Sequence, residues 1–136
     1  MKKALVLSVV GLSLLSSLSF AKAKDCSLYV MRPSITHSMY GTNTGDNKVN
    51  AGVIGILSKN GFSVTTNQSK ARYVMQTEVR CGKMWTFFGL QDACQTEVTF
   101  TDTKEEKIVF TDGPTTAKPG LNIDFNEINF PKCSDL

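Results

Sequence analysis

The chain has few of the residue types on which most enzymes depend. Its 136 residues include a single histidine, His37, and four cysteines, no two of which have C-x-x-C spacing. This composition argues against the common zinc sites. The sequence also contains neither a G-x-S-x-G motif nor a glycine-rich phosphate-binding loop. We therefore expect a protein without metal, cofactor or catalytic residues.

The chain also has no excess of positive charge when its first 22 residues are left out of the count. The formal net charge is +3, from 15 basic and 12 acidic residues. Three of the basic residues, Lys2, Lys3 and Lys22, lie in the first 22 positions. The rest of the chain is close to neutral, which favours neither a nucleic acid nor an anionic surface as partner.

The first 23 residues have the pattern of an export signal. Lys2 and Lys3 precede an apolar run over residues 4–20, and Ala21-Lys22-Ala23 offers a small-x-small cleavage site. We predict a signal peptide over 1–23, with cleavage after Ala23 or, as second choice, Ala21. A retained membrane anchor is the alternative, for which the run has the minimum length.

Cleavage after Ala23 would leave residues 24–136 as a single domain in the periplasm, or secreted. Four cysteines in an exported chain predict two disulfides, for which three pairings exist. We favour Cys81 with Cys94 and Cys26 with Cys133. We do not expect Cys26 to be a lipid-anchor cysteine, because Ala23-Lys24-Asp25 before it lacks the apolar and small residues that a lipobox requires.

The stretch from Tyr73 to Asp102 alternates as two half-buried strands of a hairpin do. Its apolar face carries Tyr73, Met75, Thr77, Val79 and Cys81 in the first arm and Cys94, Thr96, Val98 and Phe100 in the second. If Cys81 pairs with Cys94, Met75 lies opposite Phe100.

Shorter elements surround this hairpin. Strands are expected over 26–32, 62–66 and 107–111, a loop over 34–46, and an extended segment or edge strand over 121–133. A helical stripe is formed by Val49, Val53, Ile56 and Leu57. Thr44 or Asp46 is expected to cap the start of this helix, and Asn60-Gly61 to end it.

This order of elements predicts an α+β fold. We expect a single mixed or mainly antiparallel β-sheet with one principal helix packed on one face and two disulfides.

The stretches 56–64, 71–79, 98–102 and 107–110 share a sequence pattern with a known group of domains. In chain order, they form a helix that ends in a glycine, a short strand, a strand that starts after Ala71-Arg72-Tyr73, and a hairpin with an acidic turn. This pattern resembles small βαβββ periplasmic domains of Gram-negative envelope assembly proteins. Among these are the amino-terminal domain of the Tol-system propeller protein and lipoproteins of lipopolysaccharide and curli assembly. The resemblance implies a non-catalytic adaptor role in the cell envelope. Here, however, the lipid-anchor cysteine is missing and a cysteine-closed aromatic loop is added.

That loop, from Gly82 to Ala93, has an unusually apolar composition for the end of a hairpin. Its candidate partner-binding residues are Lys83, Met84, Trp85, Phe87, Phe88 and Leu90. Tryptophan, methionine and phenylalanine are enriched at the centres of protein interfaces. One interpretation is a finger that binds an envelope protein or a membrane surface. The other is a loop that folds back and extends the core.

Other functions have weaker support in the sequence. A secreted enzyme inhibitor would use the same constrained loop. A small secreted hydrolase would need a site built on His37 with Ser38 and Asp46, or on Glu78 opposite Glu97 with Arg80 beside them. We interpret His37 as a surface residue and the glutamates as part of an open polar face. The oligomeric state has no indicator in the sequence.

Overall fold

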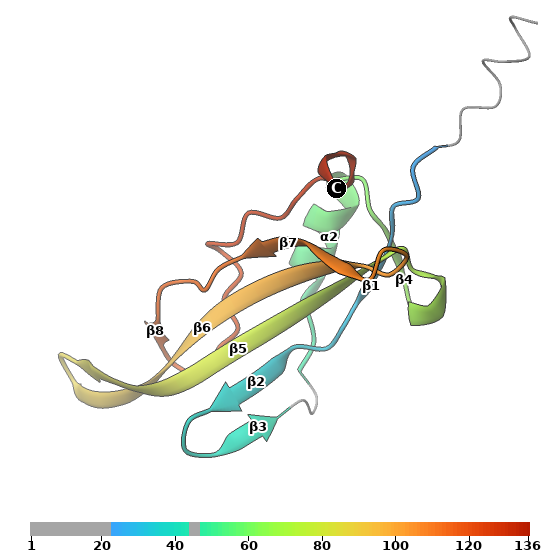
Figure 1. Cartoon of the computed structure of the whole chain (residues 1–136). Coiled ribbons are helices and arrows are strands. Elements are labelled where there is room, and N and C mark those ends of the chain that lie inside the picture. Colours follow the sequence, from blue (N-terminus) through green and yellow to red (C-terminus); the bar gives the residue numbers. More distant parts are fainter. Residues whose placement is uncertain (1–22, 44–46) are drawn as a thin grey trace, which may run out of the picture.

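A computed structural model describes residues 23–43 and 47–136. The predicted signal peptide therefore lies outside the described residues except for Ala23, as do Thr44 and Asp46. The elements, labelled in Figure 1, are β1 (Ser27–Val30), β2 (Ser34–His37), β3 (Gly41–Asn43), α2 (Ala51–Lys59), β4 (Ser63–Thr65), η1 (Gln68–Lys70), β5 (Tyr73–Thr86), β6 (Gly89–Asp102), β7 (Lys107–Asp112), β8 (Lys118–Pro119) and η2 (Cys133–Asp135).

The long hairpin of β5 and β6 is the centre of one mixed sheet, which has eight strands among the described residues. β1 and β2 follow one another along the outer side of β5, and both are parallel to it. Beyond them lie β4, parallel to β1, and β3, antiparallel to β2. On the other side, β7 and β8 both pair antiparallel with β6. The α+β class and the mixed sheet agree with the sequence-based prediction.

The register of the hairpin is the predicted one. Cys81 lies opposite Cys94, Met75 opposite Phe100 and Val79 opposite Thr96. The disulfides join Cys81 to Cys94 and Cys26 to Cys133, the pairing favoured above. The alternation of apolar and polar residues and the cysteine positions therefore determine this register together.

The helix α2 packs on the sheet through Val53 and Leu57, which are both buried. Ile56, expected in the same stripe, is exposed instead. The cap is also not a residue proposed above, since the Asn50 side chain accepts the backbone N–H of Val53 at 2.9 Å. The helix ends at Asn60 and Gly61 as predicted, with Gly61 in the left-handed region at φ 91°.

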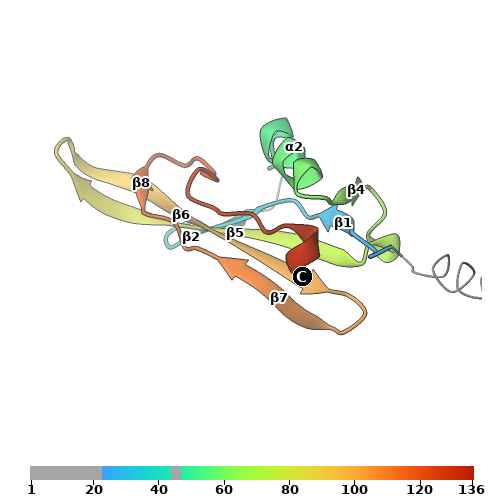
Figure 2. The same ribbon diagram turned by 90° about the horizontal axis from the view of Figure 1, so that it is seen from above.

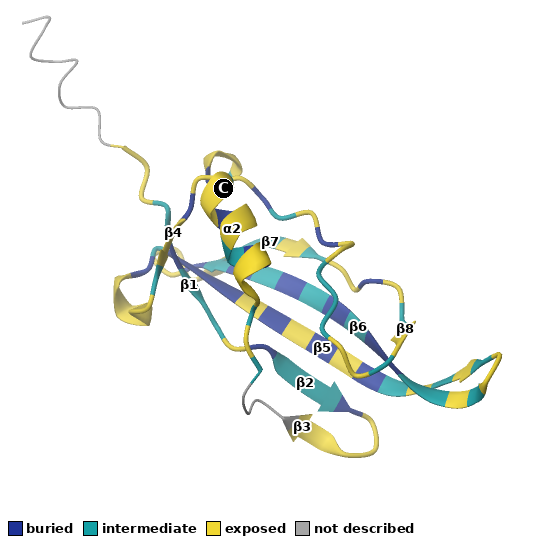
Figure 3. Ribbon diagram, turned by 180° about the vertical axis from the view of Figure 1, so that it is seen from behind, coloured by how far each residue is buried: buried dark blue, intermediate teal, exposed yellow. Residues whose placement is uncertain are grey.

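The main core lies between one face of the sheet, α2 and the C-terminal tail. Its buried members are Leu28, Val53, Leu57, Phe62, Tyr73, Met75, Val98, Phe100, Ile128 and Cys133. A smaller cluster of Val79 with the Cys81–Cys94 disulfide continues this core toward the end of the hairpin, where Ile35 and Ile123 pack against it. Figure 3 shows the resulting alternation of buried and less buried residues along β5 and β6.

Three other parts of the chain differ from what was expected. The predicted loop over 34–46 contains the hairpin of β2 and β3, because β2 is held by pairing with β5, and β3 by pairing with β2, rather than by an apolar pattern of their own. Of the two alternatives for the tail over 121–133, the edge strand is wrong. The tail, described throughout, has no strand before η2 and follows the core in an irregular path. Pairing with β6 continues at β8, Lys118–Pro119, where no strand was expected.

Candidate functional site

The hairpin continues through the stretch expected to be a loop. Residues 82–93, here called the finger, remain paired as far as Thr86 and Gly89, so the connection consists of Phe87 and Phe88 alone. Gly89 supplies the left-handed backbone that so tight a turn requires, at φ 101°. The predicted loop is thus a paired two-stranded ribbon that projects beyond β2 and β8 (Figures 1 and 2).

The Thr86 side chain forms hydrogen bonds with two backbone groups at the turn. Its Oγ1 accepts the N–H of Phe88 at 3.2 Å and donates to the carbonyl oxygen of Gly89 at 2.9 Å. A hydroxyl that both accepts and donates closes the turn from within. The two phenylalanine side chains are therefore presented from an ordered backbone.

The large apolar side chains of the finger lie in water. Their exposed fractions are 79% for Trp85, 98% for Phe87, 84% for Phe88 and 51% for Leu90. Trp85 lies opposite Leu90, and the two phenylalanine rings meet edge to face with centroids 5.5 Å apart. Met84 is half-buried. The alternative that this segment folds back to extend the core is therefore wrong for this structure.

The base of the finger is closed by an ion pair and a hydrogen bond beside the disulfide. Asp92 Oδ1 lies 2.8 Å from Lys83 Nζ and 3.0 Å from His37 Nε2. The hydrogen bond from Lys83, followed by that from His37, holds the pKa of Asp92 below its usual value. In turn, Asp92 raises the pKa of Lys83. Lys83 and Asp92 therefore remain a charged pair across the two strands at neutral pH.

His37 is not the surface residue expected from the sequence. Only 6% of it is exposed, and its Nδ1 accepts the backbone N–H of Met39 at 3.0 Å while Nε2 faces Asp92. The ring also lies 4.6 Å from that of Tyr40. His37 thus joins the turn between β2 and β3 to the base of the finger. Asp46, its expected acidic partner, lies outside the described residues.

The opposed glutamates behave as the sequence analysis expected. Glu78 pairs with Glu97 across the hairpin, and Arg80 Nη2 lies 3.1 Å from Glu78 and 4.0 Å from Glu97. The side chains of Glu78 and Arg80 are exposed on the open face, so the arginine compensates the like charges. Within residues 23–43 and 47–136, no three His, Cys, Asp or Glu side chains gather as a metal site would require.

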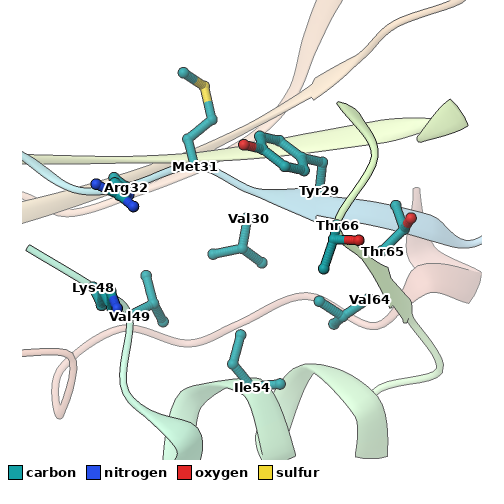
Figure 4. A pocket seen from close by; sticks show the side chains of 10 residues that line it. All are labelled: Tyr29, Val30, Met31, Arg32, Lys48, Val49, Ile54, Val64, Thr65 and Thr66. Carbon is teal, nitrogen blue, oxygen red and sulfur yellow. The ribbon is translucent and has the colours of Figure 1, made fainter. Parts of the chain in front are cut away.

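A separate shallow pocket of about 340 Å³ lies where β1, β4 and the start of α2 meet (Figure 4). Val30, Val49, Ile54 and Val64 give it aliphatic walls, and Arg32 and Lys48 lie near one another at one end. None of these residues was singled out from the sequence as functional. The described lining contains no acid, histidine or cysteine for acid–base or nucleophilic chemistry.

Comparisons with known proteins assign no family. A scan against models of known protein families finds no match, and a search of curated proteins also finds none. Among solved structures, the chain is similar to lipoprotein GNA1162 from Neisseria meningitidis, with 13% identity and a TM-score of 0.46. The match covers 73% of this chain and 87% of that one. A likeness at this level carries no argument about function.

In the part of the chain that the structure describes, no helix has the length and apolar character needed to cross a membrane.

Proposed function

We propose that this protein is a non-catalytic, exported binding module of the bacterial cell envelope, and that the finger is its docking element. The observation that carries the proposal is the exposure of Trp85, Phe87, Phe88 and Leu90 at the end of a fully paired hairpin. Keeping apolar area in water costs roughly 25 cal/mol for each Å² relative to burial. A surface of this kind is typical of a contact site.

The construction of the finger supports the same role. The Cys81–Cys94 disulfide, the Lys83–Asp92 ion pair and the Thr86 hydrogen bonds fix its backbone before any partner arrives. Less conformational entropy is then lost on binding. The two disulfides also suit the oxidising compartment that the predicted signal peptide implies.

The contacts of His37 favour binding over the alternative of a hydrolase. Both ring nitrogens already have partners, Met39 N–H and Asp92, and the ring is buried. A general base needs a nitrogen within reach of the proton that it removes. The proposed role of His37 is therefore to hold the finger against β2. An enzyme inhibitor would use the same finger and differs only in its partner.

Photocrosslinking in living cells tests this proposal. A photoreactive amino acid replaces Phe88, and a matched variant carries it at Ile108, an exposed apolar residue of β7. We expect a crosslinked product, to protein or to lipid, from position 88 and none from position 108. Equal products from both positions, or none from position 88, would contradict docking through the finger.

A further inference from the structure

Building on the proposed function, we infer that the surface the finger docks on is a phospholipid bilayer. Phe87 and Phe88, which have no polar side-chain atoms, form the turn. Trp85 and Leu90 lie two residues behind them, and the Lys83–Asp92 ion pair lies a further two residues back. Phenylalanines at the turn, then the amphipathic Trp85 beside Leu90, then a charged pair follow the polarity of a bilayer from its acyl region to its headgroups.

The length of the uncharged part fits this placement. No charged side chain occurs from Met84 to Gln91. At about 3.3 Å per residue, the strand from Met84 to the turn is about 10 Å long. Interfacial protein segments bury their apolar faces about 5–10 Å deep in the boundary between headgroups and acyl chains. The charged pair would then lie among the headgroups.

The hydrogen bonds of the turn suit transfer of its backbone from water to lipid. A peptide group without a hydrogen-bond partner is costly in lipid. Thr86 Oγ1 supplies partners for the Phe88 N–H and the Gly89 carbonyl, two of the backbone groups at the turn.

A second turn points toward the same surface. Because β2 is parallel to β5, the turn after β2 faces the same way as the tip of the finger (Figure 1). This turn exposes Met39 and Tyr40. His37 pairs with Cys81, so the turn lies about level with the base of the finger, at headgroup depth. Tyrosine, with an apolar ring and a polar hydroxyl, suits that depth.

The ion pair at the base of the finger has no net charge, so we expect binding to be largely independent of lipid charge. Lys83 and Asp92 neutralise each other, so apolar burial rather than attraction to anionic lipid is the driving force. We expect similar partitioning of the protein onto vesicles of phosphatidylcholine alone and onto vesicles that also contain phosphatidylglycerol. Added salt should have little effect.

Vesicle binding by the purified, processed protein with its disulfides intact tests the inference. Trp85 is the chain's one tryptophan, so its fluorescence reports on the finger alone. We expect sedimentation with phosphatidylcholine vesicles, a blue shift of the emission, and quenching by lipids brominated along the acyl chain. Replacing both Phe87 and Phe88 by serine should weaken partitioning at least about tenfold, since two apolar side chains no longer leave water. Ile108→Ser is the matched control and should bind as the parent does.

The substitution Thr86→Val tests separately whether the hydrogen bonds of the turn contribute to lipid binding. It keeps the shape of the side chain but removes both hydrogen bonds, and should weaken partitioning about fivefold. Thr86→Ser, which retains the hydroxyl, should bind as the parent does. Equal binding by Thr86→Val and the parent would contradict entry of the turn into lipid.

Other outcomes separate this inference from the proposed function. Absence of binding to both kinds of vesicle, or binding that survives loss of both phenylalanines, would overturn the bilayer as the docking surface. If a photoreactive residue at position 88 still captured a discrete protein, docking through the finger would stand with a protein partner. If neither vesicles nor crosslinking gave a finger-dependent signal, both proposals would fall.

Discussion

Asp102 is the most heavily bonded carboxylate at the end of the hairpin remote from the finger. Its two oxygens bind the Arg72 side chain at 2.9 and 2.8 Å, and Oδ1 also accepts the backbone N–H groups of Lys104 and Glu105. The hydrogen bond from Arg72 is the main cause that lowers the pKa of Asp102 to about 2. Asp102 thereby ties the end of β6 to the start of β5.

This lowered pKa makes a prediction about stability. An acid with a depressed pKa in the folded state stabilises it above the pKa of the unfolded chain and loses that effect as the pH falls. We expect Asp102→Asn to lower the free energy of unfolding by about 2 kcal/mol at neutral pH. The difference from the parent should shrink between about pH 4 and pH 2.

Urea denaturation across this pH range provides the measurement. Glu106→Gln, a change in the same turn at an exposed carboxylate, is the control and should alter stability by less than about 0.5 kcal/mol. A loss for Asp102→Asn that stayed constant down to pH 2 would show that the carboxylate charge is not its source.

The hairpin of β5 and β6 shows how far local pattern predicts an element. Alternation of apolar and polar residues with a period of two, together with one cysteine pair, was sufficient to predict its register. Extending that register also places Lys83 opposite Asp92. The contact of His37 with Asp92 was not predictable in this way, because it depends on β2 lying parallel to β5. No local pattern in the polar segment 34–43 indicates such a long-range pairing.

Removal of the Cys81–Cys94 disulfide should loosen this element from the finger inward. Under the loop-entropy description, a bridge across so few residues contributes about 3 kcal/mol to the free energy of unfolding. We expect Cys81→Ala with Cys94→Ala to lose about that much stability. Amide hydrogen exchange should accelerate in residues 82–93 more than in the paired residues 73–79 and 96–102. Unchanged exchange in the finger would mean that its other contacts hold it without the bridge.

The molecule as a whole places its main core at one end of the hairpin and the exposed apolar side chains of the finger at the other. The Cys26–Cys133 bridge and the tail close the core end, where the Asn60 side chain donates to the carbonyls of Phe130 and Pro131. The sequence indicated the bridge but not the path of the tail, since the tail is held by scattered packing and side-chain contacts rather than by a strand ladder. Exposure of the finger was likewise left open, because an apolar segment is compatible with burial or with docking.

That exposure is the foundation of both proposals, and collisional quenching of Trp85 in the isolated protein tests it directly. With one tryptophan in the chain, emission arises from the finger alone. We predict the long-wavelength emission of an indole in water and quenching by acrylamide almost as efficient as that of a free tryptophan derivative. Blue-shifted emission that is shielded from acrylamide would contradict a projecting, unoccupied finger.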